Sequence, residues 1–194
     1  MTEEDRPTDE GLLDRYLSGD SDAFHELMSR HEDRVFSVCL RIMGDRESAL
    51  DATQETFLTL YRKANRFSGR SAFTTWLYRV TVNTCYDQLR RIRRHQAQPL
   101  DESPQVDDPA QQDQLGAREV RQEIEAALAR LPPDFRTAVV LVDMEDLSLK
   151  EVSDVVGVPV GTVKSRVFRA RRLLAESLGN LAPPSVHPIG DNDA

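Results

Sequence analysis

Residues 148–174 constrain the fold more than any other segment of the chain. Ser148, followed three residues later by Glu151, forms a capping box that predicts a helix start, and three valines after it share one apolar face. Gly157 ends this helix, and a second helix is expected over residues 161–178. Two short helices joined at a glycine-containing turn are typical of a helix-turn-helix, whose second helix enters the DNA major groove.

The second of these helices carries a strongly basic face. The residues expected on this face are Lys164, Ser165, Arg166, Phe168, Arg169, Arg171 and Arg172. Only Glu176 opposes these cations, although the chain as a whole has a net charge of -8. A solvated amphipathic helix is the alternative, but this asymmetry of charge favours DNA binding.

The composition restricts the class of protein. A chain of 194 residues predicts one or two small domains. Its net charge of -8 argues against a protein that coats DNA alone, because phosphate neutralisation supplies most non-specific affinity. No apolar run reaches the roughly 18 residues of a membrane span, and no basic stretch precedes an apolar one. We therefore expect a cytoplasmic protein with no membrane association.

Two cysteines, Cys39 and Cys85, fall within helical patterns flanked by apolar residues. They lack the CxxC or Cys/His spacing of zinc sites, and the histidines likewise show no ligand spacing. We expect buried, reduced packing residues, with a redox pair as the alternative. The sequence predicts no metal, no cofactor, no small-molecule substrate and no catalytic residue.

No alternation of the β type occurs, so the sequence predicts an all-α fold of two small helical domains joined by a flexible acidic linker. The first domain is expected over residues 9–95 and the second over 116–179. Between them, residues 96–115 are rich in Pro, Gln, Asp and Ser and bury too little apolar area to offset their ordering entropy. Residues 1–8 are expected to be disordered and 180–194 to form a loose tail.

Local signals set the expected helix ends and inward faces. Ser21 and Asp134 are positioned to cap helices that begin there. In a helix over residues 46–65, Leu50 and Tyr61 fit the apolar period and are expected to face inward.

The same helix has a polar ridge at helical neighbour spacing, formed by Asp51, Gln54, Glu55 and Leu58. The ridge could be a solvated face, or it could dock a basic surface of a partner protein. The residues alone favour the solvated face.

The next helix, expected over residues 71–94, carries aromatic and basic residues on one stripe. Its members are Trp76, Arg79, Asn83, Tyr86, Asp87, Arg90 and Arg94. Core packing alone would explain Trp76 and Tyr86, but not the arginines. Aromatic rings with arginines and an amide form a platform on which bases stack while their phosphates are neutralised.

The loop before this helix, residues 66–71, combines two arginines and two serines with Gly69. It could hold a nucleotide turned out of its stack, or it could be a plain helix connector. The residues of the loop favour neither interpretation over the other.

Four segments, in this order, resemble motifs of the extracytoplasmic-function (ECF) sigma factors of bacterial RNA polymerase. Residues 51–57, DATQETF, match DxxQExF, and residues 73–79, FTTWLYR, match a TWLyRI-like motif. Residues 83–91, NTCYDQLRR, match NxxxDxxRR, and residues 161–171, GTVKSRVFRAR, match GTVkSRlfRAR. The likeness covers nearly the whole chain except both ends and the linker, and it points to a SigM-like subgroup. One small departure is Ser153, where the family usually has Ala.

The resemblance implies three sets of binding residues, in domains that correspond to sigma regions 2 and 4. The set implied to dock on the clamp coiled coil of the polymerase's largest subunit is Asp51, Gln54, Glu55, Phe57 and Leu58. The set implied to bind the single-stranded −10 element is Phe67, Ser68, Gly69, Arg70, Ser71, Trp76, Arg79, Asn83, Tyr86, Arg90 and Arg91. The set implied to read the −35 element is Thr162, Lys164, Ser165, Arg166, Phe168, Arg169 and Arg172.

The resemblance further implies an alternative sigma factor, not an enzyme, that directs promoter-specific transcription initiation and aids strand opening. Its implied partners are core RNA polymerase, promoter DNA and an anti-sigma factor that controls it. A stand-alone helix-turn-helix transcriptional regulator is the alternative, and it would leave the ridge on residues 51–58 and the stripe on residues 76–94 unexplained.

Overall fold

The computed structural model describes residues 7–69, 71–96 and 115–179. Within these ranges every regular element is a helix, which confirms the all-α prediction. The segments expected to be disordered or flexible, 1–8, 96–115 and 180–194, lie almost wholly outside the described residues, as does Arg70.

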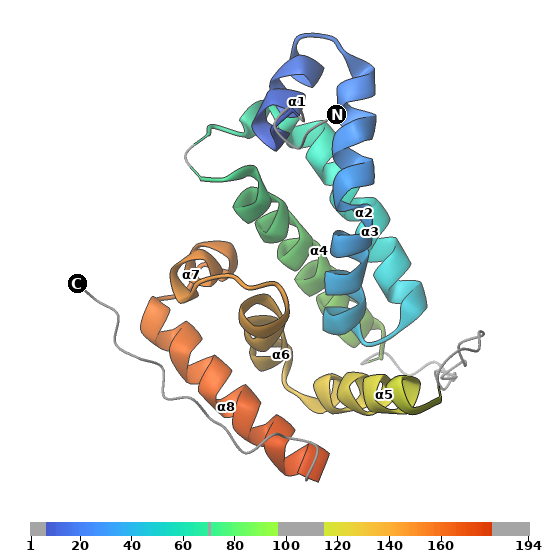
Figure 1. Cartoon of the computed structure of the whole chain (residues 1–194), viewed down its shortest axis with the longest axis vertical. Coiled ribbons are helices and arrows are strands. Elements are labelled where there is room, and N and C mark those ends of the chain that lie inside the picture. The colour runs from blue at the N-terminus through green and yellow to red at the C-terminus, as the bar shows by residue number, and fades with distance from the viewer. Residues whose placement is uncertain (1–6, 70, 97–114, 180–194) are drawn as a thin grey trace.

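The N-terminal half holds four α-helices and one short helical turn (Figure 1). They are α1 (Asp9–Leu17), α2 (Ser21–Met43), α3 (Arg46–Lys63), η2 (Ala64–Arg66) and α4 (Phe73–Gln96). The long helices α2, α3 and α4 pack against one another, and α1 covers one end of α2. Each helix buries one apolar face, as expected of a small bundle.

The C-terminal half holds four α-helices and one π-helical turn. They are α5 (Leu115–Arg130), α6 (Pro133–Val139), η3 (Val140–Met144), α7 (Leu149–Val156) and α8 (Val160–Leu178). Figure 1 shows α6 and α7 between the long helix α8 and the N-terminal half, with α7 packed against α4.

Two expected caps are wrong by one residue or more. Asp20, not Ser21, caps α2, because its carboxylate accepts the backbone N–H groups of the first turn. Asp134 does not cap α6, which starts at Pro133 after Pro132 and has no side-chain cap. A proline at the first helical position favours a helix start, because its fixed φ is helical and its missing N–H would have had no partner within the helix.

The helix-turn-helix predicted from the capping box is present. Ser148 Oγ accepts the N–H of Glu151 over 3.2 Å, and the Glu151 carboxylate accepts the N–H of Ser148 over 2.8 Å. Gly157 ends α7 in the left-handed conformation (φ 71°), which glycine adopts without strain. Ser153, the small departure from the family pattern, has a structural role, because its hydroxyl donates to the carbonyl of Val158 over 2.6 Å and closes the turn.

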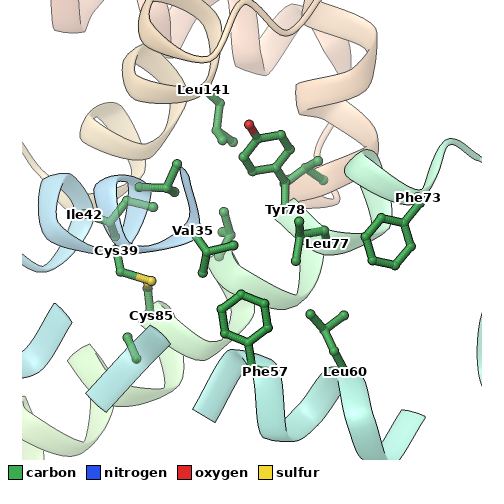
Figure 2. Close-up of a cluster of buried hydrophobic side chains, with 14 of the residues drawn as sticks. Val35, Cys39, Ile42, Phe57, Leu60, Phe73, Leu77, Tyr78, Cys85 and Leu141 are labelled. Atoms are coloured by element: carbon green, nitrogen blue, oxygen red, sulfur yellow. The ribbon is translucent and has the colours of Figure 1, made fainter. Parts of the chain in front are cut away.

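One apolar core runs through both halves of the chain. In Figure 2, side chains of α2, α3 and α4 meet around Val35 and Leu77, and Leu141 of η3 points into the same cluster toward Tyr78. Leu141 is fully buried. Cys39 and Cys85 also lie in this core as free thiols with sulfurs 3.8 Å apart, as predicted for packing residues.

A buried carboxylate joins the same two halves. Glu145, directly after η3, accepts from Arg34 Nε over 2.8 Å, Arg41 Nη1 over 3.2 Å and Tyr78 Oη over 2.7 Å. Burial and the bond to Glu145 raise the pKa of Tyr78, and the same carboxylate raises the pKa of Arg34. Both shifts keep these groups as hydrogen-bond donors.

The shared core predicts that both halves unfold together as long as they are docked. Leu141→Ala should lower the free energy of unfolding of the docked form by about 2–5 kcal/mol, as for other buried leucines. Leu17→Ala is the control, because Leu17 is 48% exposed and its truncation should change stability little. Urea denaturation followed by circular dichroism measures both. Two separate transitions in the original protein would contradict a shared core.

The capping box predicts a pH dependence. Hydrogen bonds from Ser148 lower the pKa of Glu151 below its ordinary value of 4.5. The carboxylate therefore stabilises the fold above pH 4.5, and this contribution disappears as the pH falls through the depressed folded value. Glu151→Gln should lower the melting temperature at pH 7 and matter progressively less below pH 4.5. For the exposed Glu123→Gln, the difference in melting temperature from the original protein should not shrink with falling pH in this way. A melting-temperature difference for Glu151→Gln that is independent of pH would contradict the role of the Glu151 carboxylate in the capping box.

Candidate nucleic-acid interface

Helix α8 presents a basic outer face because its apolar residues are buried against α6 and α7. Val163, Val167 and Ala170 are at most 2% exposed. The predicted residues that lie on the outer surface are Lys164, Ser165, Phe168, Arg169 and Arg172, whereas Thr162 and Arg166 are half-buried. Phe168 is 68% exposed, so its ring is open to contact with a partner.

Two arginines of α8 are tied to the C-terminal half itself. Arg166 donates to Asp134 of α6 over 2.6 Å, and Arg171 holds Asp143 of η3 through two hydrogen bonds of 2.9 and 2.5 Å. These pairs fix α8 to its neighbours. In the described part of the chain, Lys164 and Arg169 have no ion pair, which leaves them as the cations best placed to meet DNA.

Some residues of the stripe on α4 are exposed, and others contact the C-terminal half. Asn83, Arg90 and Arg91 are exposed, as expected for a platform open to nucleic acid. Arg79 instead donates from Nε to the carbonyl of Asp154 on α7 over 3.0 Å.

Tyr86 is directed toward α6. Its hydroxyl oxygen is buried, and among the described residues it has no hydrogen-bond partner. The hydroxyl oxygen of Thr137 on α6 is likewise buried and without a hydrogen-bond partner there. Burial raises the pKa of Tyr86. The predicted stripe is therefore not one continuous exposed surface in this conformation.

The loop before α4 leads into an aromatic cluster. Phe67 lies 5.4 Å from Trp76 and 6.0 Å from Phe73, measured between ring centroids, while Ser68 and Gly69 are exposed. Trp76 and Ser71 are half-buried. The loop and the rings of α4 are thus adjacent, as the flipped-nucleotide interpretation requires.

Helix α1 positions the start of α4. Glu10 accepts the backbone N–H of Phe73 over 2.9 Å, although the two residues are 63 positions apart. A carboxylate at a helix N-terminus is favourable because the helix dipole is positive there. No local sequence pattern predicts this hydrogen bond.

Four arginines surround a shallow depression at the C-terminal end of α4. They are Arg90, Arg91, Arg93 and Arg94, and the depression also contacts Asp87, which pairs with Arg90. This concentration of positive charge suits a phosphate backbone.

The polar ridge of α3 lies on the surface, whereas Phe57, which the resemblance adds to the implied docking set, does not. Asp51, Gln54 and Leu58 lie on the surface, and Glu55 approaches Arg62 at 3.8 Å. Phe57 is 8% exposed and belongs to the core. Its place in the motif is therefore structural in this conformation.

Two residues expected to face inward from α3 extend this surface. Leu50 is 43% and Tyr61 is 56% exposed, so that prediction is wrong. With Gln54 and Leu58 they follow helical spacing along one stripe. The outer face of α3 is therefore more apolar than the sequence suggested, which is typical of a protein-binding surface.

Among the described residues there is no cluster of His, Cys, Asp and Glu able to hold a metal ion. Within the same ranges, none of the helices is long and apolar enough to cross a membrane.

Comparisons with known families and proteins agree with this arrangement. The chain matches Sigma-70 region 2 over residues 27–95 and Sigma-70, region 4 over residues 121–174. The ECF RNA polymerase sigma factor SigM of Mycobacterium tuberculosis is 38% identical over 174 residues, covering 90% of this chain and 86% of the relative. SigW of Bacillus subtilis is 30% identical over 173 residues, covering 84% and 92%.

Two solved structures share the fold. The sigma factor RpoE in complex with the anti-sigma factor NepR from Bartonella quintana is 28% identical, with a TM-score of 0.67 and coverage of 80% of this chain and 96% of that one. CnrH, solved with the cytosolic domain of CnrY, has the same TM-score at 23% identity, covering 90% and 99%, a likeness of fold alone. The matches to regions 2 and 4 and the identity along most of the chain show that this protein belongs to the ECF family of RNA polymerase sigma factors, transcription initiation factors among which it is similar to SigM.

Proposed function

We propose that three surfaces of this sigma factor share the work of initiation: α8 reads the −35 element, α4 with its preceding loop holds the opened −10 element, and α3 docks on core polymerase. The observation that carries the proposal is the exposure of Lys164, Phe168 and Arg169 on the recognition helix. Their chemistry fits the major groove, where cations contact guanine O6 and N7 and apolar groups contact the thymine methyl.

Strand opening needs no chemical step. The exposed amide of Asn83 lies on α4, the helix whose half-buried Trp76 borders the loop that contains Ser68 and Gly69. If this surface binds an unstacked base more tightly than a paired one, binding energy shifts the duplex toward the open state. Arg90 and Arg91 would then hold the phosphates of the same strand.

The outer face of α3 is the proposed polymerase surface. Asp51 and Gln54 supply a carboxylate and an amide, and Leu58 is 47% exposed beside them. Since the proposed partner is RNA polymerase, the site of action is the cytoplasm. We further propose control by an anti-sigma factor, which is supported by the complex of the similar RpoE with NepR.

Run-off transcription tests the proposed function directly. Bacterial core polymerase with a promoter library should give transcripts that appear only when this protein is added, and their start sites identify both promoter elements. Pull-down with core polymerase is run in parallel. Absence of both transcription and polymerase binding, together with specific duplex binding by the protein alone, would instead favour a stand-alone regulator.

Arg169→Ala tests the assignment of α8. The change should reduce discrimination at one upstream base pair by about 1–3 kcal/mol, because a base-specific contact is lost. Arg172→Ala is the comparison, since Arg172 lies one turn further along and approaches Glu176 at 3.6 Å. Binding of polymerase loaded with each variant to promoters altered at single upstream positions measures the effect. Equal weakening on every sequence would show that Arg169 contacts phosphate only.

A further inference from the structure

The two halves of the chain are in direct contact through apolar side chains. Leu141 of η3 and Val152 and Val155 of α7 belong to the same buried cluster as the core of the N-terminal half. Figure 2 shows Leu141 reaching Tyr78 of α4. This contact buries apolar area that a separated pair of domains would expose to water.

Glu145 gives the contact its polar specificity. Its side chain is 5% exposed, and its three side-chain donors Arg34, Arg41 and Tyr78 all belong to the N-terminal half. A buried carboxylate deprived of its partners is strongly destabilising. Glu145 is therefore satisfied either in this docked position or in water, but not in a partly opened interface.

Arg136 makes a second polar contact between the halves. Its guanidinium is buried and donates to the carbonyl of Ile42, at the end of α2, over 2.7 Å. It also donates to the carbonyls of Ala129 (2.5 Å) and Leu131 (3.1 Å) within its own half. Burial lowers the pKa of Arg136. The bond to Ile42 is the one that separation of the halves would break.

The docked position engages part of the proposed −10 surface. Arg79 is bonded to the backbone of α7 at Asp154, and the hydroxyl of Tyr86 is buried toward α6. Neither group can contact a DNA strand while α6 and α7 stay in place.

Geometry sets a stronger limit. Elements centred near −35 and −10 lie about 25 base pairs apart, or roughly 85 Å at 3.4 Å per base pair of B-form DNA. A compact chain of this length has a radius of gyration of about 16 Å and measures about 40 Å across. With α7 packed on α4, the two DNA-binding faces cannot reach both elements at once.

We propose that Glu145, with Arg34, Arg41 and Tyr78, is a latch that holds this sigma factor in a closed form, and that the latch must open before both promoter elements are bound. The proposal rests on the promoter-binding function proposed above. Opening exchanges the bonds to Glu145 for water and exposes Leu141, so the latch sets the fraction of molecules ready to engage a promoter.

Small-angle X-ray scattering of the full chain tests the latch without polymerase or DNA. Glu145→Ala removes it from the C-terminal half, and the double variant Arg34→Ala/Arg41→Ala removes it from the N-terminal half. Both should increase the radius of gyration by several ångströms while circular dichroism keeps its helical signal. If Glu145→Ala loses helicity, the radius of gyration of the double variant provides the test of the latch. An unchanged radius of gyration in the folded variants would overturn the latch.

Asp146→Asn is the matched control. It removes one negative charge at the next position in the chain, and Asn tolerates the left-handed backbone found there (φ 55°). Because no bond of the latch is lost, this variant should keep the radius of gyration of the original protein. An increase equal to that of Glu145→Ala would assign the effect to net charge and overturn the latch.

Transcription then tests what the latch controls. The open variants should reach half-maximal run-off transcription at a severalfold lower protein concentration than the original protein. An unchanged concentration in molecules that scattering shows to be open would overturn the inhibitory role. Scattering that shows opening, combined with no transcription by any version, would instead reject the proposed promoter function and leave the closed form standing.

Discussion

The burial of Glu145 between the two halves of the chain is the interaction on which the observed arrangement depends. A carboxylate leaves water at a cost of several kcal/mol unless charged or polar donors replace its hydration, and Arg34, Arg41 and Tyr78 do so here. Removal of one side of this contact leaves the other side buried without its partner, which destabilises the docked form, whereas full separation returns all of the groups to water. Leu141, four residues earlier, supplies the apolar part of the same contact. A contact built this way is specific in register, and in the proposed latch the binding of polymerase and DNA offsets it.

Ion pairing also divides the cations of α8 into two groups. Arg166 and Arg171 fix α8 to Asp134 and Asp143, while Lys164 and Arg169 stay on the outer face. A cation that already forms an ion pair must break that pair to contact a base. An unpaired cation gives up only its bound water. The proposed base contacts therefore fall on the second group, and the first group keeps the helix at a fixed angle.

Local features were predictable from the sequence, and contacts between distant residues were not. The capping box at Ser148 and Glu151 and the break at Gly157 depend on spacing within a few residues, so the helix-turn-helix could be predicted. The inward orientation predicted for Leu50 and Tyr61 was wrong, because the apolar period of α3 is wider than the face its neighbours cover. The contacts of Glu145 with residues more than 60 positions away follow no local pattern. The motifs similar to the ECF family pointed to α4 and α8 as the helices proposed to bind DNA, whereas the docking of the two halves emerged only from the fold.

The distance between the two halves, measured in the free protein and in the promoter complex, tests the central claim most directly. Spin labels on cysteines introduced at the exposed positions Asn65 and Ala175 report it by pulsed electron resonance, because the buried Cys39 and Cys85 stay unlabelled. The closed form predicts one narrow, short distance in the free protein and a longer one, by tens of ångströms, with core polymerase and promoter DNA. A broad distribution in the free protein, or the same short distance in the promoter complex, would contradict it.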